Sequence, residues 1–124
     1  MRDRDTPAGE AEILAFLGSP DQLARADYQG IIDRWGKHLA PGRLFVAPYA
    51  RIGSDPEALL DDINDFLGIH RLGGASKRHV TTRQNVTEGG GVPDSLRASV
   101  EATLADATLA CRELLGEIGP GRVY

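Results

Sequence analysis

The chain carries one clear β-strand signal, and this feature limits its possible folds more than any other. The apolar run Leu44-Phe45-Val46-Ala47 lies between Pro41-Gly42 and Pro48, which predicts a buried strand at about residues 43–47. A second and weaker candidate lies around His79 to Thr82. A single strand leaves its backbone N–H and C=O groups without partners. We therefore expect the strand either to pair across a homodimer or to belong to a sheet whose other strands are missing.

Helical patterns fill most of the remaining sequence. Apolar residues recur at steps of three and four, between start signals rich in serine, threonine and proline and end signals rich in glycine. These patterns predict four helices at about residues 7–18, 26–39, 55–67 and 93–115. A short helical turn is also expected after Ser19-Pro20, which has capping-box spacing to Gln22.

Two aromatic residues of the second predicted helix, Tyr28 and Trp35, share its apolar face. We expect both in the core. Cys111 lies on the apolar stripe of the last predicted helix and is expected to be a small buried hydrophobe.

Composition excludes several classes of protein. The 124 residues are 41% hydrophobic and carry a net charge of −4, which fits one small domain, or part of a larger one, better than a disordered chain. A nucleic-acid partner is not expected, since binding one requires a basic surface. No run of about eighteen apolar residues exists, so no membrane span is expected. The single cysteine and the charged N-terminus favour the cytoplasm.

The segment of residues 69–92 is predicted to be a long loop with a local basic character. No acidic residue occurs between Asp65 and Glu88, and the basic residues there are Arg71, Lys77, Arg78 and Arg83, with His70 and His79. Arginine forks on a glycine-flanked backbone suit phosphate or sulfate groups. The alternative is a solvated basic loop that binds nothing.

No self-contained catalytic motif is present. The sequence has neither a phosphate loop of the form G-x-x-x-x-G-K-[ST] nor a G-x-S-x-G elbow. The three histidines lack metal-ligand spacing, so no metal site is predicted. We therefore assign no catalytic residue from the sequence.

The order of motifs from residue 10 to 119 resembles the C-terminal half of sulfotransferases, especially the bacterial and heparan-sulfate-like branch. The resemblance rests on a helix with a tyrosine and a tryptophan, a short strand, an Asp-Pro helix start and a Phe-Leu-Gly end. In this chain these motifs are Tyr28-x6-Trp35, Pro41-Gly42-Arg43-Leu44-Phe45-Val46, Tyr49, Asp55-Pro56-Glu57, Phe66-Leu67-Gly68-Ile69, and then Asn85 and Val92-Pro93 before the last helix.

This resemblance implies an α/β fold, here the mostly helical C-terminal portion of a P-loop-like sulfotransferase fold, with residues 1–124 forming one partial domain. The family transfers a sulfuryl group from 3′-phosphoadenosine 5′-phosphosulfate (PAPS) to a hydroxyl or amine of a small-molecule or carbohydrate acceptor. Its donor-binding P-loop precedes the part that this chain resembles. The resemblance implies basic contacts to PAPS from Arg78 first, with Lys77 and Arg83. The chain alone is expected to be inactive and to need a separate N-terminal half.

One departure from the family pattern concerns the end of the predicted strand. The family usually has an acidic residue after the tyrosine, whereas this chain has Tyr49-Ala50-Arg51, which suggests a relaxed structural constraint. The alternative function is therefore a non-catalytic binding or dimerisation module with an anion-binding basic loop.

Overall fold

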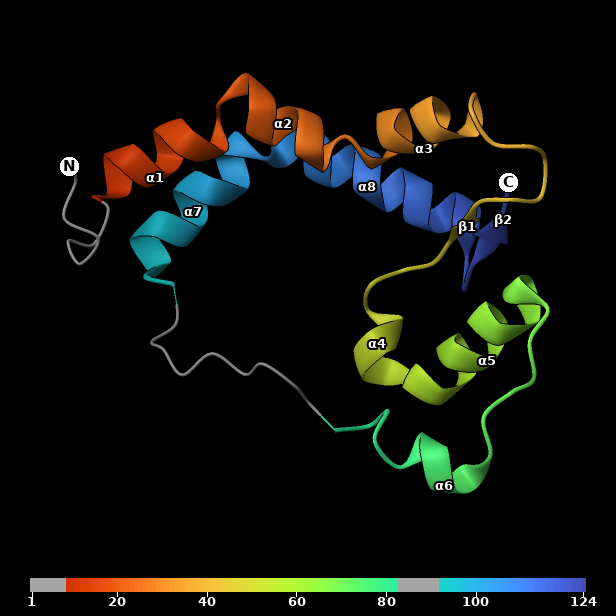
Figure 1. Cartoon of the computed structure of the whole chain (residues 1–124). Coiled ribbons are helices and arrows are strands. Elements are labelled where there is room, and N and C mark those ends of the chain that lie inside the picture. The colour runs from red at the N-terminus through yellow and green to blue at the C-terminus, as the bar shows by residue number, and fades with distance from the viewer. Residues whose placement is uncertain (1–8, 83–91) are drawn as a thin grey trace, which may run out of the picture. The chain divides into compact units, whose positions relative to one another are not determined.

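The computed structural model describes residues 9–82 and 92–124 (Figure 1). These residues are mostly helical and contain one small sheet of two strands, which is compatible with the expected α/β class. They divide into two compact units, one formed by residues 9–33 and 92–114 and the other by residues 34–82 and 115–124. No helix in these ranges is both long and apolar enough to span a bilayer.

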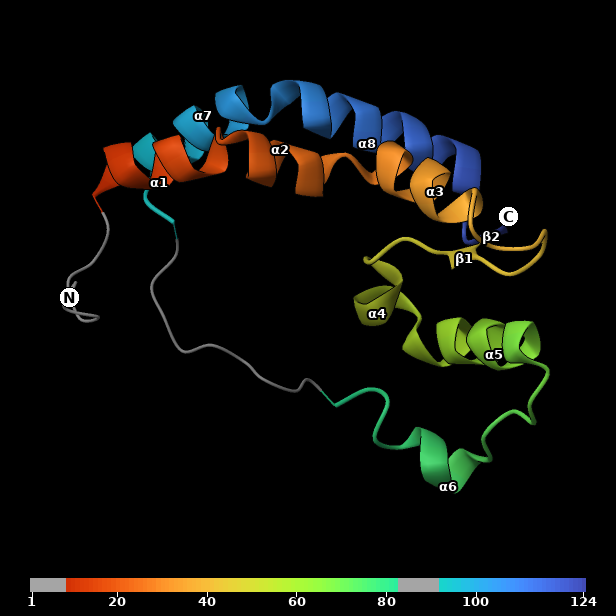
Figure 2. The same ribbon diagram turned by 45° about the horizontal axis from the view of Figure 1, so that its top comes forward.

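The first unit is helical. It contains α1 (Glu10–Leu17), α2 (Pro20–Ala26), α7 (Asp94–Thr103), the first part of α3 (Tyr28–Gly36) and most of α8 (Ala105–Ile118). Helix α1 packs against α2 and α7, and α1 lies beside α7 in both views (Figure 1, Figure 2). The Ser95 hydroxyl joins the two helices by donating a hydrogen bond of 3.2 Å to the Glu10 carboxylate. The buried apolar residues of this unit are Ile32, Leu96 and Leu114.

Several observed helices begin or end at other residues than predicted, because a side chain caps the helix or a single residue interrupts it. Helix α3 begins at Tyr28 because the Asp27 carboxylate accepts a 3.0 Å hydrogen bond from the Gly30 N–H and so caps it. The single helix predicted at 93–115 is wrong, since Leu104 separates α7 from α8 and α8 continues to Ile118. The short helix after Ser19 is confirmed as α2. The Ser19 hydroxyl does not cap α2, because it donates to the Phe16 carbonyl.

Two aromatic residues predicted in the core lie on the surface. Tyr28 is 53% and Trp35 is 59% exposed, although they share a face of α3 with Ile32. Among the described residues only the part of the stripe around Ile32 is covered, so amphipathicity identified the apolar face correctly but not its burial. Cys111 is only partly buried.

The second unit holds the sheet, and its topology corrects the expectation of an unpaired strand. Strand β1 (Phe45–Val46) pairs antiparallel with β2 (Arg122–Val123), with Phe45 opposite Val123 and Val46 opposite Arg122. The main chains of Leu44 and Tyr124 extend this pairing, because each N–H bonds to the carbonyl of the other residue. The partner of the strand is therefore the C-terminal segment of the same chain. The other candidate strand, His79 to Thr82, is a turn.

Three helices complete the second unit. They are α4 (Arg51–Ser54), α5 (Pro56–Leu67) and α6 (Gly74–Lys77). The predicted helix at 55–67 is confirmed as α5, with Pro56 in its first turn and Gly68 in a left-handed conformation (φ 69°) at its end. The Phe66 ring of α5 stacks on the Phe45 ring of β1 at 5.6 Å between centroids. Ile118, at the end of α8, is 4% exposed.

Candidate functional site

The segment after α5 is where the sequence predicted an anion-binding loop. Its first basic residue, Arg71, is held by the preceding helix. The Arg71 guanidinium donates two hydrogen bonds to the Asp65 carboxylate, one of them 2.9 Å long, and lies 3.8 Å from Asp61. This contact lowers the pKa of Asp65 below its usual value, chiefly through the hydrogen bonds from Arg71. Arg71 therefore binds its own chain.

Lys77 is also occupied by its own chain. Its ammonium group at the end of α6 lies 2.8 Å from the Asp61 carboxylate of α5, and both side chains are 18% exposed. An ammonium in this position serves to fix α6 onto α5. An incoming phosphate or sulfate would compete with Asp61 for it.

Arg78 differs from its neighbours. It is exposed, and within the described ranges it makes no ion pair or side-chain hydrogen bond. The adjacent His79 is exposed as well. Arg83 lies outside the described residues. Three cations were predicted to contact an anion. Of these, Arg78 is free for a ligand, Lys77 is paired with Asp61, and Arg83 is not described.

Binding of PAPS by the predicted loop depends on how many of its positive groups are free. This donor carries a diphosphate-like group and a separate 3′-phosphate, and a protein holds such groups with several guanidinium, ammonium or backbone N–H donors. In the described part of the predicted loop, the guanidinium of Arg78 is exposed and free, while the ammonium of Lys77 and the guanidinium of Arg71 are paired with Asp61 and Asp65.

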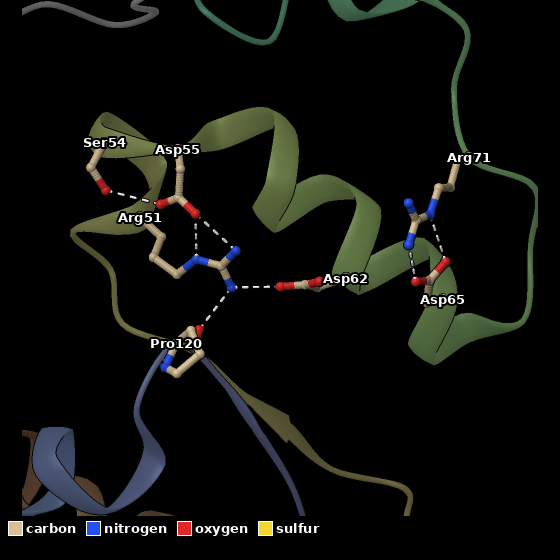
Figure 3. A network of polar contacts seen from close by, with 7 residues as sticks. All are labelled: Arg51, Ser54, Asp55, Asp62, Asp65, Arg71 and Pro120. Carbon is tan, nitrogen blue, oxygen red and sulfur yellow. Dashed lines mark hydrogen bonds and ion pairs between the residues drawn. The ribbon is translucent and has the colours of Figure 1, made fainter.

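Among the described residues of the second unit, Arg51 lies at the centre of a polar cluster that the sequence did not predict (Figure 3). It follows β1 at the start of α4 and is 8% exposed. Its guanidinium donates to the Asp55 carboxylate at 2.9 Å, to the Asp62 carboxylate at 2.7 Å and to the Pro120 carbonyl at 2.7 Å. The side chain therefore joins α4, α5 and the C-terminal segment.

The Arg51 cluster lies in the segment Tyr49-Ala50-Arg51, where the resemblance stated above led us to expect an acidic residue. The sequence suggested a relaxed constraint there, yet Arg51 has three partners and is nearly buried. Its hydrogen bonds, with that from the Ser54 hydroxyl, lower the pKa of Asp55. The signal available in the sequence was an Arg-x-x-x-Asp spacing within one helical turn, which occurs too often to identify a buried cluster.

Two buried polar atoms of α5 have no hydrogen-bond partner among the described residues. They are the side-chain nitrogen Nδ2 of Asn64 and the oxygen Oδ1 of Asp61. Asn64 is 5% exposed, and its main-chain carbonyl accepts the Ile69 N–H that ends the helix. Within the described part of the chain, no group of histidine, cysteine and acidic residues is arranged to hold a metal ion.

Comparison of the chain with protein-family models, with curated proteins and with solved structures found no match.

Proposed function

We propose that this chain is a sulfotransferase-like module that binds a second polypeptide segment, and that the segment supplies the PAPS site. One observation carries the proposal: α3, β1 and α5 follow one another as helix, strand and helix. The motifs that resemble the C-terminal half of sulfotransferases occur in the same order. The fold of that family is built on a larger sheet, and β1 has one described neighbour, the two-residue strand β2. The remaining edge of β1 is the place where additional strands would pair.

The charge distribution supports a module without transferase activity of its own. Sulfuryl transfer requires several positive groups around the transferred oxygens, in the same way as phosphoryl transfer. The described residues leave Arg78 as the free cation of the predicted loop. In a transferase complex, that loop would therefore contact the donor through Arg78 and, at most, Arg83. The partner segment would supply the other contacts to the donor.

A sulfate-transfer assay with labelled PAPS and simple hydroxyl and amine acceptors tests whether the chain needs a second segment for activity. We expect no turnover by the purified 124 residues, and turnover would show that the chain holds a complete active site. Thermal-shift titration with adenosine 3′,5′-bisphosphate, the product of the donor, tests whether this chain makes a contact of its own with the nucleotide through Arg78. We expect a small rise in melting temperature at millimolar ligand that the Arg78→Ala variant loses.

Arg112→Ala is the matched control for this titration. Arg112 is an exposed arginine of α8, outside the predicted loop. An equal loss of binding in both variants would indicate general attraction to positive charge. No shift with the unmodified chain would remove the case for any nucleotide contact.

A non-catalytic anion-binding module is the second candidate, and the exposed pair Arg78 and His79 favours it. It predicts a similar shift with inorganic sulfate or phosphate as with the nucleotide. The sulfotransferase proposal predicts a larger shift with the nucleotide, so titration with both ligands separates the two.

A further inference from the structure

The C-terminal strap, which we define as residues 119–124, is held almost entirely by main-chain contacts. The Tyr124 carbonyl accepts hydrogen bonds from the Gly42 and Leu44 N–H groups, and the Tyr124 N–H donates to Leu44. The β2 residues within the strap pair with β1. Two side chains of the rest of the unit also meet the strap: the Arg51 guanidinium donates to the Pro120 carbonyl, and the Phe45 ring lies beside Gly121.

Two side chains of the strap, those of Arg122 and Val123, contribute little to its attachment. Arg122 and Val123 are exposed, and the Arg122 guanidinium lies 4.8 Å above the Tyr124 ring, which belongs to the strap itself. The close approach to β1 depends on a missing side chain, since a Cβ on Gly121 would lie 2.9 Å from the Phe45 ring. A strap with these properties can make the same contacts with β1 of any copy of the chain.

The junction between α8 and the strap is a sharp turn. Gly119 has a φ of 56°, in the left-handed region that an L-residue with a side chain avoids, and Pro120 and Gly121 follow it. The turn folds the strap back toward β1 of its own chain. If the turn opened, α8 and the strap would extend and the strap would reach beyond its own β1.

We propose that two copies of this chain exchange their C-terminal straps, so that β2 of each copy pairs with β1 of the other. Exchange retains the strap contacts with β1, Gly42 and Arg51, because those contacts do not depend on which chain supplies the strap. It opens the left-handed turn at Gly119. The inference goes beyond the proposed function and does not depend on it.

A disulfide across the sheet distinguishes exchange from simple docking. Val46 and Arg122 are opposite each other in the register, so the variant Val46→Cys/Arg122→Cys, with Cys111→Ala to remove the native thiol, places two thiols on facing strands. We expect oxidation at low protein concentration to give monomers with an internal disulfide. Oxidation after incubation at high concentration should give covalent dimers on a denaturing, non-reducing gel. The single-thiol variant Arg122→Cys/Cys111→Ala measures dimers that form by random collision.

Two outcomes overturn the proposal. One is a dimer in light scattering whose oxidised form separates into monomers on the denaturing gel, because its straps have not exchanged. The other is a monomer at every concentration from about 10 µM to about 1 mM, the range in which a weak dimer is populated.

The hinge itself gives a second test that needs no disulfide. Gly119→Ala strains the closed turn and not the opened one, so it should raise the dimer association constant on the order of tenfold, measured by light scattering. The control is Gly116→Ala, three residues earlier, where the added Cβ meets no atom within 4 Å and φ is not positive. An unchanged association constant in Gly119→Ala contradicts exchange through this hinge.

Discussion

The guanidinium of Arg51 donates a 2.7 Å hydrogen bond to the main-chain carbonyl of Pro120, 69 positions further along the sequence. This contact links the helix that follows β1 to the segment that becomes β2. The contact therefore attaches the C-terminal segment to α4 through polar groups. On the apolar side, the Phe45 ring of β1 stacks on the Phe66 ring of α5. The stability of the second unit should therefore depend on a few identifiable residues.

We expect Arg51→Ala to lower the melting temperature by several degrees, because it removes the donor shared by Asp55, Asp62 and Pro120. Arg51→Lys keeps the charge but cannot reach three acceptors with one fork, so its melting temperature should be intermediate. The control is Arg43→Ala, at an exposed arginine near β1. Circular dichroism melting compares the three variants, and equal effects of Arg43→Ala and Arg51→Ala would disprove a special role for the cluster.

The pH dependence of stability should reflect Asp55. Its pKa in the folded chain lies below the ordinary value of 3.8, chiefly because of the hydrogen bond from Arg51 and then that from Ser54. A depressed pKa means that the carboxylate stabilises the fold fully above pH 3.8 and loses this contribution as the pH falls through the folded-state pKa. The Asp55→Asn variant should have a lower melting temperature than the unmodified chain at pH 7. Below pH 3.8 the two melting curves should approach each other, and a constant difference down to pH 2 would contradict this assignment.

The close approach of the strap to the Phe45 ring predicts a steric effect at Gly121. A Cβ added there would lie 2.9 Å from two ring carbons, so Gly121→Ala should lower the free energy of unfolding by about 1–2 kcal/mol. In contrast, Gly116→Ala, in α8 with open space around it, should raise it by about 0.5–1 kcal/mol through helix propensity. Urea unfolding measures both variants. A stabilising effect of Gly121→Ala would mean that the ring does not lie against the strap.

Neighbouring cations of the basic loop should behave differently on substitution. Lys77→Met removes the partner of the partly buried Asp61 carboxylate and should cost about 1–2 kcal/mol of unfolding free energy. Arg78→Ala removes an exposed side chain without a described partner and should change it by less than about 0.5 kcal/mol. The two substitutions are one residue apart, so each controls for the other in the same denaturation experiment. Equal losses would show that Arg78 also holds the fold.

The sequence predicted those elements whose signals are local. Helix α5 is the clearest case, because Asp55-Pro56 at its start, an apolar stripe ending in Phe66-Leu67 and Gly68 at its end all lie within fourteen consecutive residues. The position of β1 was also predicted correctly, since an apolar run between prolines identifies a short strand. The resemblance of these motifs to sulfotransferases stays a prediction that the transferase and nucleotide experiments test.

Only the tertiary structure decided which segments pair. Strand β2 has two residues, Arg122 and Val123, which are too few for an alternating pattern, and its partner lies about 77 positions earlier in the chain. The role of Arg51 depends on that same pairing, because one of its acceptors, the Pro120 carbonyl, comes near only when β2 joins β1. Burial was not predictable for Tyr28 and Trp35. Periodicity placed both on one apolar face of α3, but both are exposed, because burial depends on what covers that face. Helix and cap signals act over a few residues, whereas strand pairing and burial depend on residues far apart in the chain, and for this reason the sequence determined the former and not the latter.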